Sequence, residues 1–377
     1  MLTAVIVGYG ERGETLTRIL RTHFSDQVKI TAIVDPNVYV REVAHKQVQV
    51  STYEDLVEVF SDVVLWPDIV IIATNPPLHC EQVITAANYG CAIFCEKPLA
   101  LSPIETDRMV AAVRRSGVPC TVDFETVFAD SFHVLQAYLG SEGFGDLLRF
   151  DAVDKGRPPA YDIETCMPHF LHAMMQLTGS KPVEVFARVL VDGRRATLED
   201  VRPISELYPQ GRTHDIGLRA DTIEASYLFE NGVTARFFLS ALDKVYIEEA
   251  GKSSGKAGSE FMHFVCYGTR GQIKFHQTAT GSVYIKSVPQ DTPGNMTWQP
   301  VPVLWQPDPT WITPTTRLMR DFLNAVEDGR RRRKLHTTLP TIEDAALVVD
   351  MTSGIYASHL ANMPVVLPLV NRKHPLK

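Results

Sequence analysis

The chain has 377 residues, and at about 150 residues per domain this length favours two or three domains. Hydrophobic residues make up 45% and charged residues 21%, which excludes a disordered or collagen-like chain. The net charge of −7 argues against broad binding to nucleic acid or to a membrane surface. No apolar run approaches the roughly 20 residues needed to cross a bilayer, and no basic signal region opens the chain. We therefore expect a cytoplasmic protein.

The six cysteines, at positions 80, 91, 95, 120, 166 and 266, show neither a CxxC pair nor the Cys/His spacing of a zinc site. They are expected to be reduced and mostly buried thiols. No metal site is predicted.

Strand-like and helix-like segments alternate through the first 122 residues. Apolar runs predict strands over residues 2–7, 29–34, 68–73, 91–95 and 119–122. Between them, helices are predicted after the glycines that follow the first strand, over 77–88, and from Pro103 to a stop at Gly117. Ser102 and Glu105 have the spacing of a capping box. This alternation predicts an α/β fold with a parallel, doubly wound sheet.

A glycine-rich turn directly follows the first predicted strand. Its residues Gly8-Tyr9-Gly10-Glu11-Arg12-Gly13 form a GxGxxG pattern, and Asp35 ends the second strand 22 residues after Gly13. The glycines permit a tight turn and close backbone approach, so that the helix N-terminus can face a pyrophosphate. Asp35 can accept hydrogen bonds from the adenosine ribose. The alternative is a plain glycine turn with a surface aspartate.

Two further motifs identify a family. Thr74, Asn75 and His79 stand in the stretch Ala73-Thr74-Asn75-Pro76-Pro77-x-His79 after the third strand, and Glu96-Lys97-Pro98 follows the strand ending at Cys95. Together with the glycine turn, these motifs resemble the Gfo/Idh/MocA oxidoreductases, the family of glucose–fructose oxidoreductase and inositol 2-dehydrogenase. The resemblance implies a Rossmann domain over 1–122 and an α+β domain over 123–377. It implies a large, mainly antiparallel open sheet in the second domain.

The second part of the chain supports the resemblance more loosely. Gly143-Phe144-Gly145-Asp146 precedes a strand-like run at 147–153, and residues 224–239 read as two strands around Glu230-Asn231-Gly232. Gly268-Thr269-x-Gly271 looks like a later sheet turn of the family. Helices are expected over 315–327 and 342–359, and the family's equivalents pack back toward the Rossmann domain.

A second catalytic motif of the family is only partly present. Its pattern is Asp-x-Gly-x-His-x-x-Asp, with a glycine ten residues after the histidine. Alignment on Gly179 places His169 in the histidine position, while Thr165, Met167 and His172 replace the two aspartates and the glycine. On a helix, His169 and His172 share a face. They are either a catalytic pair, or one catalytic histidine and one core histidine.

Two polar segments remain open to interpretation. Lys155, Arg157, Tyr161 and Asp162 lie just before the predicted histidine helix and could line a substrate pocket, or form a solvated loop. The basic run at 330–334 has the composition of a nuclear signal or a polyanion patch, but a solvated loop is favoured because the chain is acidic.

These observations predict an NAD(P)-dependent oxidoreductase that moves a hydride between nicotinamide and a sugar, cyclitol or related polyol. Within the resemblance, an NAD-dependent glycosidase or a noncatalytic nucleotide-binding sensor is the alternative. The predicted catalytic residues are Lys97, His169 and His172. The predicted cofactor-binding residues are Gly8, Tyr9, Gly10, Glu11, Arg12, Gly13, Asp35, Thr74, Asn75, His79, Glu96 and Lys97.

NAD is the expected cofactor in preference to NADP, because Asp35 would repel a 2′-phosphate and no arginine follows in Pro36-Asn37-Val38. The expected partners are a small-molecule substrate and further copies of the chain, in a homo-dimer or homo-tetramer. Tyr227, Phe229, Phe237 and Leu239 alternate on predicted strands and are expected on an open apolar face. Binding to nucleic acid or membranes is not expected.

Overall fold

The computed structural model describes residues 1–61, 66–155, 163–203, 216–240, 262–277, 282–287, 298–301, 312–330 and 339–377. The chain divides into two compact units. The first comprises residues 1–124 with 315–349, and the second comprises 125–314 with 350–377. The two units have different architectures, which follow from different strand and helix orders.

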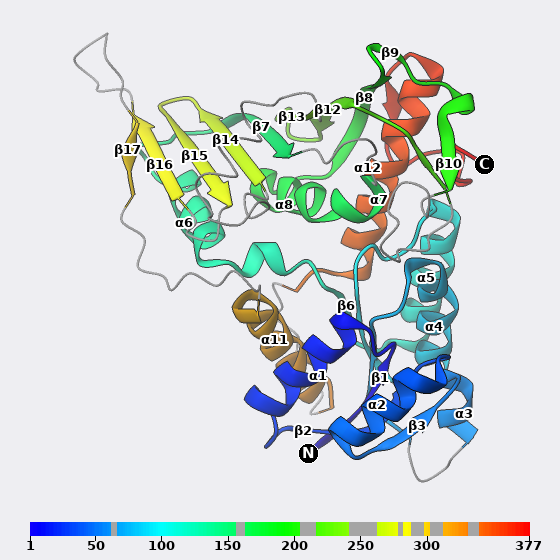
Figure 1. Ribbon diagram of the computed structural model, residues 1–377. Coiled ribbons are helices and arrows are strands. Elements are labelled where there is room, and N and C mark those ends of the chain that lie inside the picture. The colour runs from blue at the N-terminus through cyan, green and yellow to red at the C-terminus, as the bar shows by residue number, and fades with distance from the viewer. Residues whose placement is uncertain are drawn as a thin grey trace. The chain divides into compact units, whose positions relative to one another are not determined.

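The first unit contains a six-stranded, wholly parallel sheet in the order β3-β2-β1-β4-β5-β6 (Figure 1). This order reverses beside β1, as in a doubly wound nucleotide-binding sheet. The strands are β1 (Leu2–Val7), β2 (Val28–Val34), β3 (Ser51–Tyr53), β4 (Ile69–Ile72), β5 (Ala92–Cys95) and β6 (Cys120–Val122). The predicted Rossmann-type α/β fold is confirmed.

Helices connect successive strands of this sheet because parallel strands need crossover connections. They are α1 (Glu11–His23), α2 (Val38–Val48), α3 (Leu56–Ser61), α4 (Pro76–Asn88) and α5 (Pro103–Ser116). Helix α11 (Ile312–Arg330) joins this unit from Thr315 onward, and Phe322 packs edge-on against Phe94 of β5 with ring centroids 5.6 Å apart. The apolar runs of β4 and β5 are buried at every residue, and each helix except α2 buries several apolar residues.

The start of α5 differs from its sequence prediction in detail. Gly117 ends the helix with a φ of 67°, as expected for a left-handed C-terminal residue. The Ser102 hydroxyl, however, donates to Glu105 Oε2 at 2.6 Å and caps no backbone N–H. The prediction of a capping box is therefore wrong, since the two side chains bind each other instead of the helix backbone.

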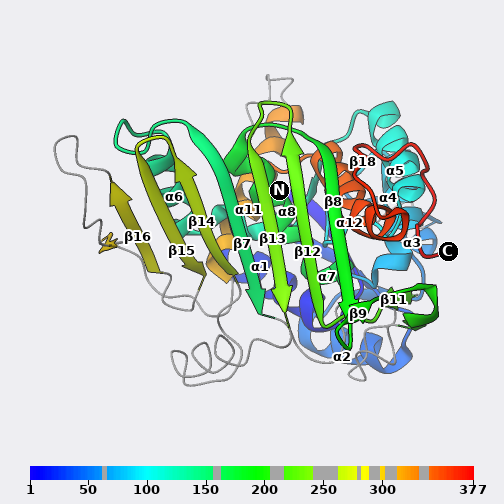
Figure 2. The same cartoon turned by 90° about the horizontal axis from the view of Figure 1, so that it is seen from above.

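The second unit is built on a mixed, mostly antiparallel sheet. Its strand order is β17-β16-β15-β14-β7-β13-β12-β8-β18, and only the β7–β13 pair is parallel among the described strands (Figure 2). The strands on this path are β7 (Leu147–Lys155), β8 (Pro182–Val191), β12 (Thr222–Phe229), β13 (Thr234–Ser240), β14 (Met262–Gly268), β15 (Gly271–Gln277), β16 (Ser282–Ser287), β17 (Gln299–Pro300) and β18 (Val365–Val366). The predicted large antiparallel sheet is confirmed in this coarse form.

Helices and short strands complete this unit. Helices lie on one face of the sheet: α6 (Asp130–Leu139), α8 (Pro168–Thr178) and, from Asp350 onward, α12 (Ile342–Ala361) (Figure 2). The remaining elements are η1 (Glu125–Phe128), α7 (Ile163–Cys166), β9 (Arg194–Arg195), η2 (Leu198–Asp200), β10 (Val201–Pro203) and β11 (Ile216–Leu218).

The apolar face of this sheet is covered within the chain itself. Phe237 packs against Phe170 of α8 with ring centroids 5.8 Å apart, and the Tyr227 hydroxyl donates to the carbonyl of Met351 in α12. Tyr227, Phe229, Phe237 and Leu239 are each only 1% exposed. Their assignment to an open face is therefore wrong, because side chains alternate across a strand and these point toward the helices. The opposite face of β12 carries Glu224, Ser226 and Leu228.

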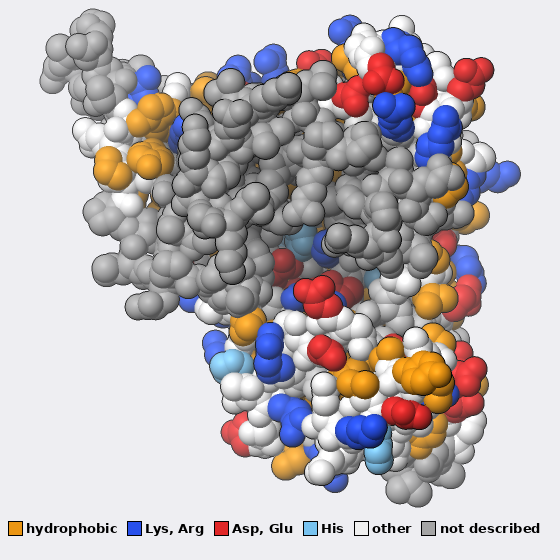
Figure 3. All heavy atoms as spheres, viewed as in Figure 1, with side chains coloured by type: hydrophobic (Ala, Val, Ile, Leu, Met, Phe, Trp, Pro, Cys, Tyr) orange, Lys and Arg blue, Asp and Glu red, His pale blue; other side chains and the backbone are white. Residues whose placement is uncertain are grey.

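Charged side chains are mixed in sign on the visible described surface. In Figure 3, Lys and Arg side chains lie among Asp and Glu side chains on the first unit instead of gathering in one basic patch. None of the helices in the described residues combines the length and apolarity that a membrane crossing requires.

Candidate active site

The glycine turn between β1 and α1 is shaped by close backbone packing. Gly8 has a φ of 87°, and a Cβ there would lie 2.7 Å from the Ala73 carbonyl oxygen. A Cβ at Gly13 would overlap the carbonyl oxygen of Gly8. At Gly10, in contrast, a Cβ would meet no atom of the described residues within 4 Å, and no side chain among them caps the N-terminus of α1. The turn thus has open space beside exposed backbone N–H groups, which fits a pyrophosphate.

Asp35 is fixed beside this turn. Its Oδ2 accepts a hydrogen bond from the backbone N–H of Tyr9 at 2.9 Å, and its Oδ1 accepts one from Asn37 at 2.9 Å. Because a carboxylate has about four lone-pair positions, two remain for a ribose diol. Arg41 donates to the carbonyl oxygens of Asp35 and Pro36. The carboxylate is therefore oriented by the same loop that would bind the pyrophosphate.

His79 connects two of the sequence motifs. Its Nδ1 lies 2.9 Å from the Pro98 carbonyl oxygen and its Nε2 lies 3.0 Å from the Thr74 carbonyl oxygen. The imidazole is fully buried, and burial lowers the pKa of His79. The Thr74 hydroxyl donates to Gln82, and Asn75 precedes α4. His79 therefore joins the loop after β4 to the segment that carries Lys97.

Lys97 is the accessible residue of a buried segment. Every residue from Cys91 to Pro103 is buried except Lys97, which is half-buried. The segment follows the carboxyl end of β5, where parallel α/β sheets bind their ligands. The chain thus presents one amine at this sheet edge and buries its neighbours.

Arg12 reaches from the glycine turn to two buried carboxylates. Its Nε donates to Glu96 Oε1, and its Nη2 donates to Asp123 Oδ2 and, at 3.1 Å, to the Thr315 hydroxyl. Burial by itself raises the pKa of Glu96, but the Arg12 guanidinium and a side-chain hydrogen bond with Asp123, with a smaller contribution from Lys97, more than offset this, so that its pKa lies below the ordinary value. Arg12 was predicted to bind the cofactor, and its guanidinium is engaged with these protein groups.

Two members of this cluster lie outside the motifs that the sequence predicts. Asp123 and Thr315 were not singled out, although Asp123 directly follows β6 and so lies at the sheet edge where ligands bind. Position after a parallel strand is the signal that could have identified it. For Thr315, which lies 303 residues from Arg12 in the chain, the sequence offers no such signal.

The second unit holds the two predicted histidines on one helix. His169 lies in the first turn of α8, and its Nδ1 is 3.5 Å from Glu125 Oε2. His169 is 6% exposed, whereas His172 is fully buried. Burial lowers the pKa of His172 to about 3. This environment favours the alternative in which His172 belongs to the core, and Glu125 is a further residue that the sequence analysis missed.

The burial of His172 predicts a loss of stability in acid. Below pH 6.5 the unfolded chain binds a proton at this histidine, whereas the folded chain does so only near pH 3, so stability falls as the pH drops between these values. From pH 7 to pH 5 the loss at this one site is about 2 kcal/mol. His172→Gln should remove this part of the loss in urea unfolding at both pH values. His133→Gln, at an exposed position on α6, should leave it in place, and an equal acid response of all three proteins would contradict the prediction.

The predicted substrate residues lie largely outside the described residues. This applies to Arg157, Tyr161 and Asp162, and to residues 331–334 of the basic run. Lys155 ends β7, but its side chain is outside the described part. Their roles remain predictions.

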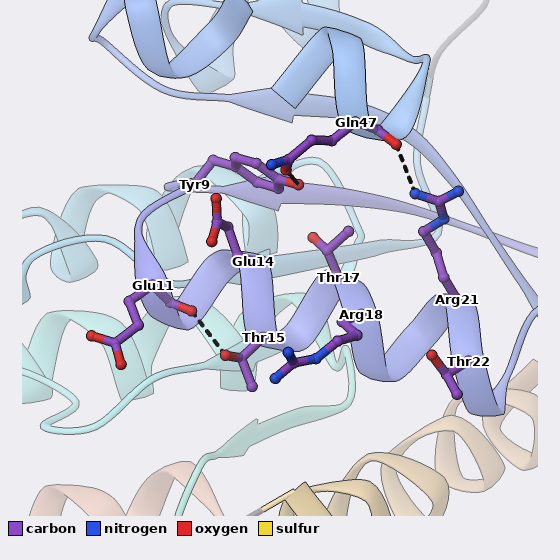
Figure 4. A pocket seen from close by; sticks show the side chains of 9 residues that line it. All are labelled: Tyr9, Glu11, Glu14, Thr15, Thr17, Arg18, Arg21, Thr22 and Gln47. Carbon is purple, nitrogen blue, oxygen red and sulfur yellow. Dashed lines mark hydrogen bonds between the residues drawn. The ribbon is translucent and has the colours of Figure 1, made fainter. Parts of the chain in front are cut away.

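A cavity of about 680 Å³ lies along α1 (Figure 4). Tyr9 and Gln47 form one side of it, and the Tyr9 hydroxyl donates to Gln47 Oε1 at 2.9 Å. Arg21 donates to the carbonyl oxygen of Gln47. Glu14 and Arg18, of opposite charge, also line it. It contains none of the three predicted catalytic residues, so its size does not make it the reaction site.

Comparison with known proteins agrees with this architecture. Residues 2–124 match the family model GFO_IDH_MocA, described as an oxidoreductase family with an NAD-binding Rossmann fold. The family resemblance predicted from the motifs is thereby confirmed for this part of the chain.

Among curated proteins, the chain is 37% identical over 113 residues to a 2,7-anhydro-N-acetylneuraminate hydratase of Mediterraneibacter gnavus, covering 30% of this chain and 29% of the relative. It is 29% identical over 172 residues to a myo-inositol 2-dehydrogenase of Thermotoga maritima, covering 43% and 51%. The chain thus matches about a third to a half of the length of these relatives. Over 98% of its length it superposes on all of a levoglucosan dehydrogenase in complex with NADH, with a TM-score of 0.74 and 18% identity. This last likeness shows the fold.

Proposed function

We propose that the protein is an NAD-dependent oxidoreductase that transfers a hydride between nicotinamide and a hydroxyl-bearing carbon of a sugar, cyclitol or related polyol. The position of Lys97 carries this proposal. Lys97 is half-buried at the carboxyl edge of a Rossmann sheet, and its neighbours Glu96 and Pro98 are bound by Arg12 and His79 of the other motifs. The family match and the inositol and levoglucosan dehydrogenases among the similar proteins support the same class.

The residues present fit a dinucleotide. The N–H groups at the start of α1 would bind the pyrophosphate, with Gly10 leaving the necessary room. Asp35 would accept from the adenosine ribose hydroxyls, and the loops at Thr74 and Glu96 would flank the nicotinamide end. When bound, the cofactor supplies the hydride acceptor or donor.

Lys97 is proposed to accept the hydroxyl proton as the carbinol is oxidised, and to return it in the reverse direction. A lysine is ordinarily protonated at neutral pH, so this role requires surroundings that favour the neutral amine. His169, whose Nδ1 lies 3.5 Å from Glu125 Oε2, is proposed to share proton transfer or to orient the substrate hydroxyl. His172, being buried, is left with a packing role.

A substrate panel tests this proposal. Polyols, sugars and aryl glycosides are each supplied with NAD or NADP, and absorbance of the reduced cofactor is followed alongside aryl release. Cofactor reduction by a polyol or sugar is the expected result. Aryl release without net reduction would instead indicate the glycosidase, and nucleotide binding with neither activity would indicate the sensor.

NAD is proposed as the preferred cofactor. Asp35, held by two backbone N–H groups, cannot turn away easily from a 2′-phosphate, and Arg41 is engaged with the carbonyl oxygens of Asp35 and Pro36. Repulsion of this kind should weaken NADP binding by roughly ten- to hundred-fold. Titration of both cofactors into the apo-protein measures it, and equal or tighter NADP binding would refute the assignment.

A homo-dimer or homo-tetramer is also proposed. The side chains first expected at such an interface are buried in the chain, so the candidate surface is the opposite face of β12, with Glu224, Ser226 and Leu228. Light scattering at micromolar concentration should give a multiple of 42.1 kDa. A monomeric mass would rule the assembly out.

A further inference from the structure

A buried histidine–glutamate pair in the second unit joins two segments that lie 210 residues apart in the chain. His374 Nε2 is 2.5 Å from Glu164 Oε1, and the two side chains are 4% and 6% exposed. The Nδ1 atom of the same ring accepts a hydrogen bond from the backbone N–H of Leu376 at 3.2 Å. This assigns the ring proton to Nε2, which donates it to the carboxylate. Because a buried carboxylate is costly unless it is hydrogen-bonded, His374 helps to fix Glu164 in this position.

The segment that carries His374 is itself anchored. Its strand β18 pairs with β8 at the edge of the sheet (Figure 2). Asp350 of α12 accepts a hydrogen bond from the backbone N–H of Leu369 at 2.9 Å, and from the two Nη atoms of Arg372 at 2.5 and 3.1 Å. A carboxylate that binds both Nη atoms of one guanidinium also fixes its orientation. The segment therefore presents the His374 imidazole from a defined position.

Glu164 lies in α7, which leads directly into α8. With four residues, α7 is too short to be a stable helix without tertiary contacts. The backbone N–H of Met167 donates to the Ile163 carbonyl oxygen, and that of Leu171 donates to the Met167 carbonyl oxygen, both at 3.1 Å. No side chain among the described residues caps α8 at Met167. The start of α8 consequently depends on how α7 is held.

The proposed proton-transfer group His169 lies in the first turn of α8, five residues after Glu164. Its Nδ1 is 3.5 Å from Glu125 Oε2, which is longer than an ordinary hydrogen bond. That contact does not by itself fix the imidazole. The position of the ring therefore follows from the position of the helix start.

We propose that His374 is a positioning residue for His169: it holds α7 through Glu164, and α7 sets the start of α8. The proposal rests on the function proposed above, in which His169 shares proton transfer or orients the substrate hydroxyl. A displacement of about 1 Å in such a group can lower a rate by about a hundredfold. Loosening α7 should therefore change kcat, and not only the stability of the chain.

The first test observes the His169 imidazole by NMR in the full chain, with 15N-labelled histidine. Its resonances are identified by their absence in His169→Gln. They should shift in His374→Ala, and also in Glu164→Met, which keeps the side-chain length without the carboxylate. In His374→Gln they should stay closer to wild type, because the amide retains an N–H donor for Glu164. Resonances of His169 that are unchanged in both His374→Ala and Glu164→Met would overturn the proposal.

The matched control is Asp200→Asn. Asp200 is a buried carboxylate of the same unit, and both of its oxygens accept hydrogen bonds from Arg194. Its loss should lower stability and leave the His169 resonances in place. A shift of these resonances in Asp200→Asn equal to that in His374→Ala would show a general loosening of the unit, which contradicts a specific role for His374.

Kinetics on the identified polyol separate this inference from the proposed function. At a temperature at which all the variants are folded, kcat should fall by about tenfold in His374→Ala, with NADH affinity unchanged, and should stay at the wild-type value in Asp200→Asn. The double variant of His374→Ala and Glu164→Met should lose no more kcat than the worse single variant, because both break the same contact. A wild-type kcat in His374→Ala, or additive losses, would refute the positioning role. If the wild-type protein turns over no substrate, the proposed reaction fails while the NMR shifts still decide the coupling, and if His374→Ala does not fold, Glu164→Met and His374→Gln decide it.

Discussion

Replacing Lys97 with methionine is expected to lower kcat by on the order of 10²–10⁴ while NADH still binds. A carbinol releases hydride readily only if its hydroxyl proton leaves as well, so a base must lie within hydrogen-bond reach. Lys97 is the accessible group of the buried segment after β5, and methionine keeps its length without the amine. Steady-state kinetics on the identified substrate and fluorescence titration of NADH measure the two quantities.

The matched control is Lys46→Met, at an exposed position on α2. It removes the same charge and should leave kcat unchanged. His169→Ala should lower kcat by less than Lys97→Met, because Lys97 carries the main proton transfer in the proposed mechanism. Activity in the oxidative direction should rise with pH. Retention of more than about a tenth of wild-type kcat in Lys97→Met would show that the lysine is structural.

The first unit was predictable where each element has its own periodic pattern. The apolar runs of β1, β4 and β5 are buried on both faces, which the sequence predicts from strand length and flanking turns. The sequence did not predict helix α2, because it lacks a periodic apolar pattern. Ala44 is its only buried residue, so it has no apolar stripe, and Val38 and Tyr39 are exposed.

The second unit shows where pattern alone is insufficient. Alternation correctly predicted the two strands around Asn231, and α11 and α12 were predicted to within a few residues. Which face of the strands the chain covers depends on helices far away in sequence. Met351 of α12 lies 124 residues from Tyr227, to whose hydroxyl its carbonyl oxygen is bound. A single sequence does not contain that pairing.

The candidate site divides in the same way. Gly8 and Asp35 could be predicted from the spacing of the glycine turn, and Lys97 from the family resemblance carried by Glu96-Lys97-Pro98. The contact of Arg12 with Asp123 spans 111 residues and is a property of the folded sheet edge. The neighbours of Arg12 in the glycine turn predict that it lies beside the cofactor. The direction of its side chain depends on the three-dimensional fold.

The glycine turn offers a pair of substitutions with separable effects. Gly13→Ala places a methyl group against the Gly8 carbonyl oxygen, so β1 and α1 must move apart. Overpacking of this kind is expected to cost about 1–3 kcal/mol of unfolding free energy. In the part of the chain that the structure describes, the methyl group of Gly10→Ala meets no atom within 4 Å, and the φ of −77° suits alanine, so its unfolding free energy should fall by less than about 1 kcal/mol.

NADH affinity should rank the two variants differently from stability. The methyl group of Gly10→Ala would occupy the space in which the pyrophosphate approaches the backbone, so NADH affinity should fall at least tenfold in a protein that unfolds almost like wild type. Gly13→Ala should lose affinity only together with stability. Urea unfolding and NADH titration on both variants give the four values. A Gly10→Ala protein that binds NADH as tightly as wild type would show that the pyrophosphate does not lie at this turn.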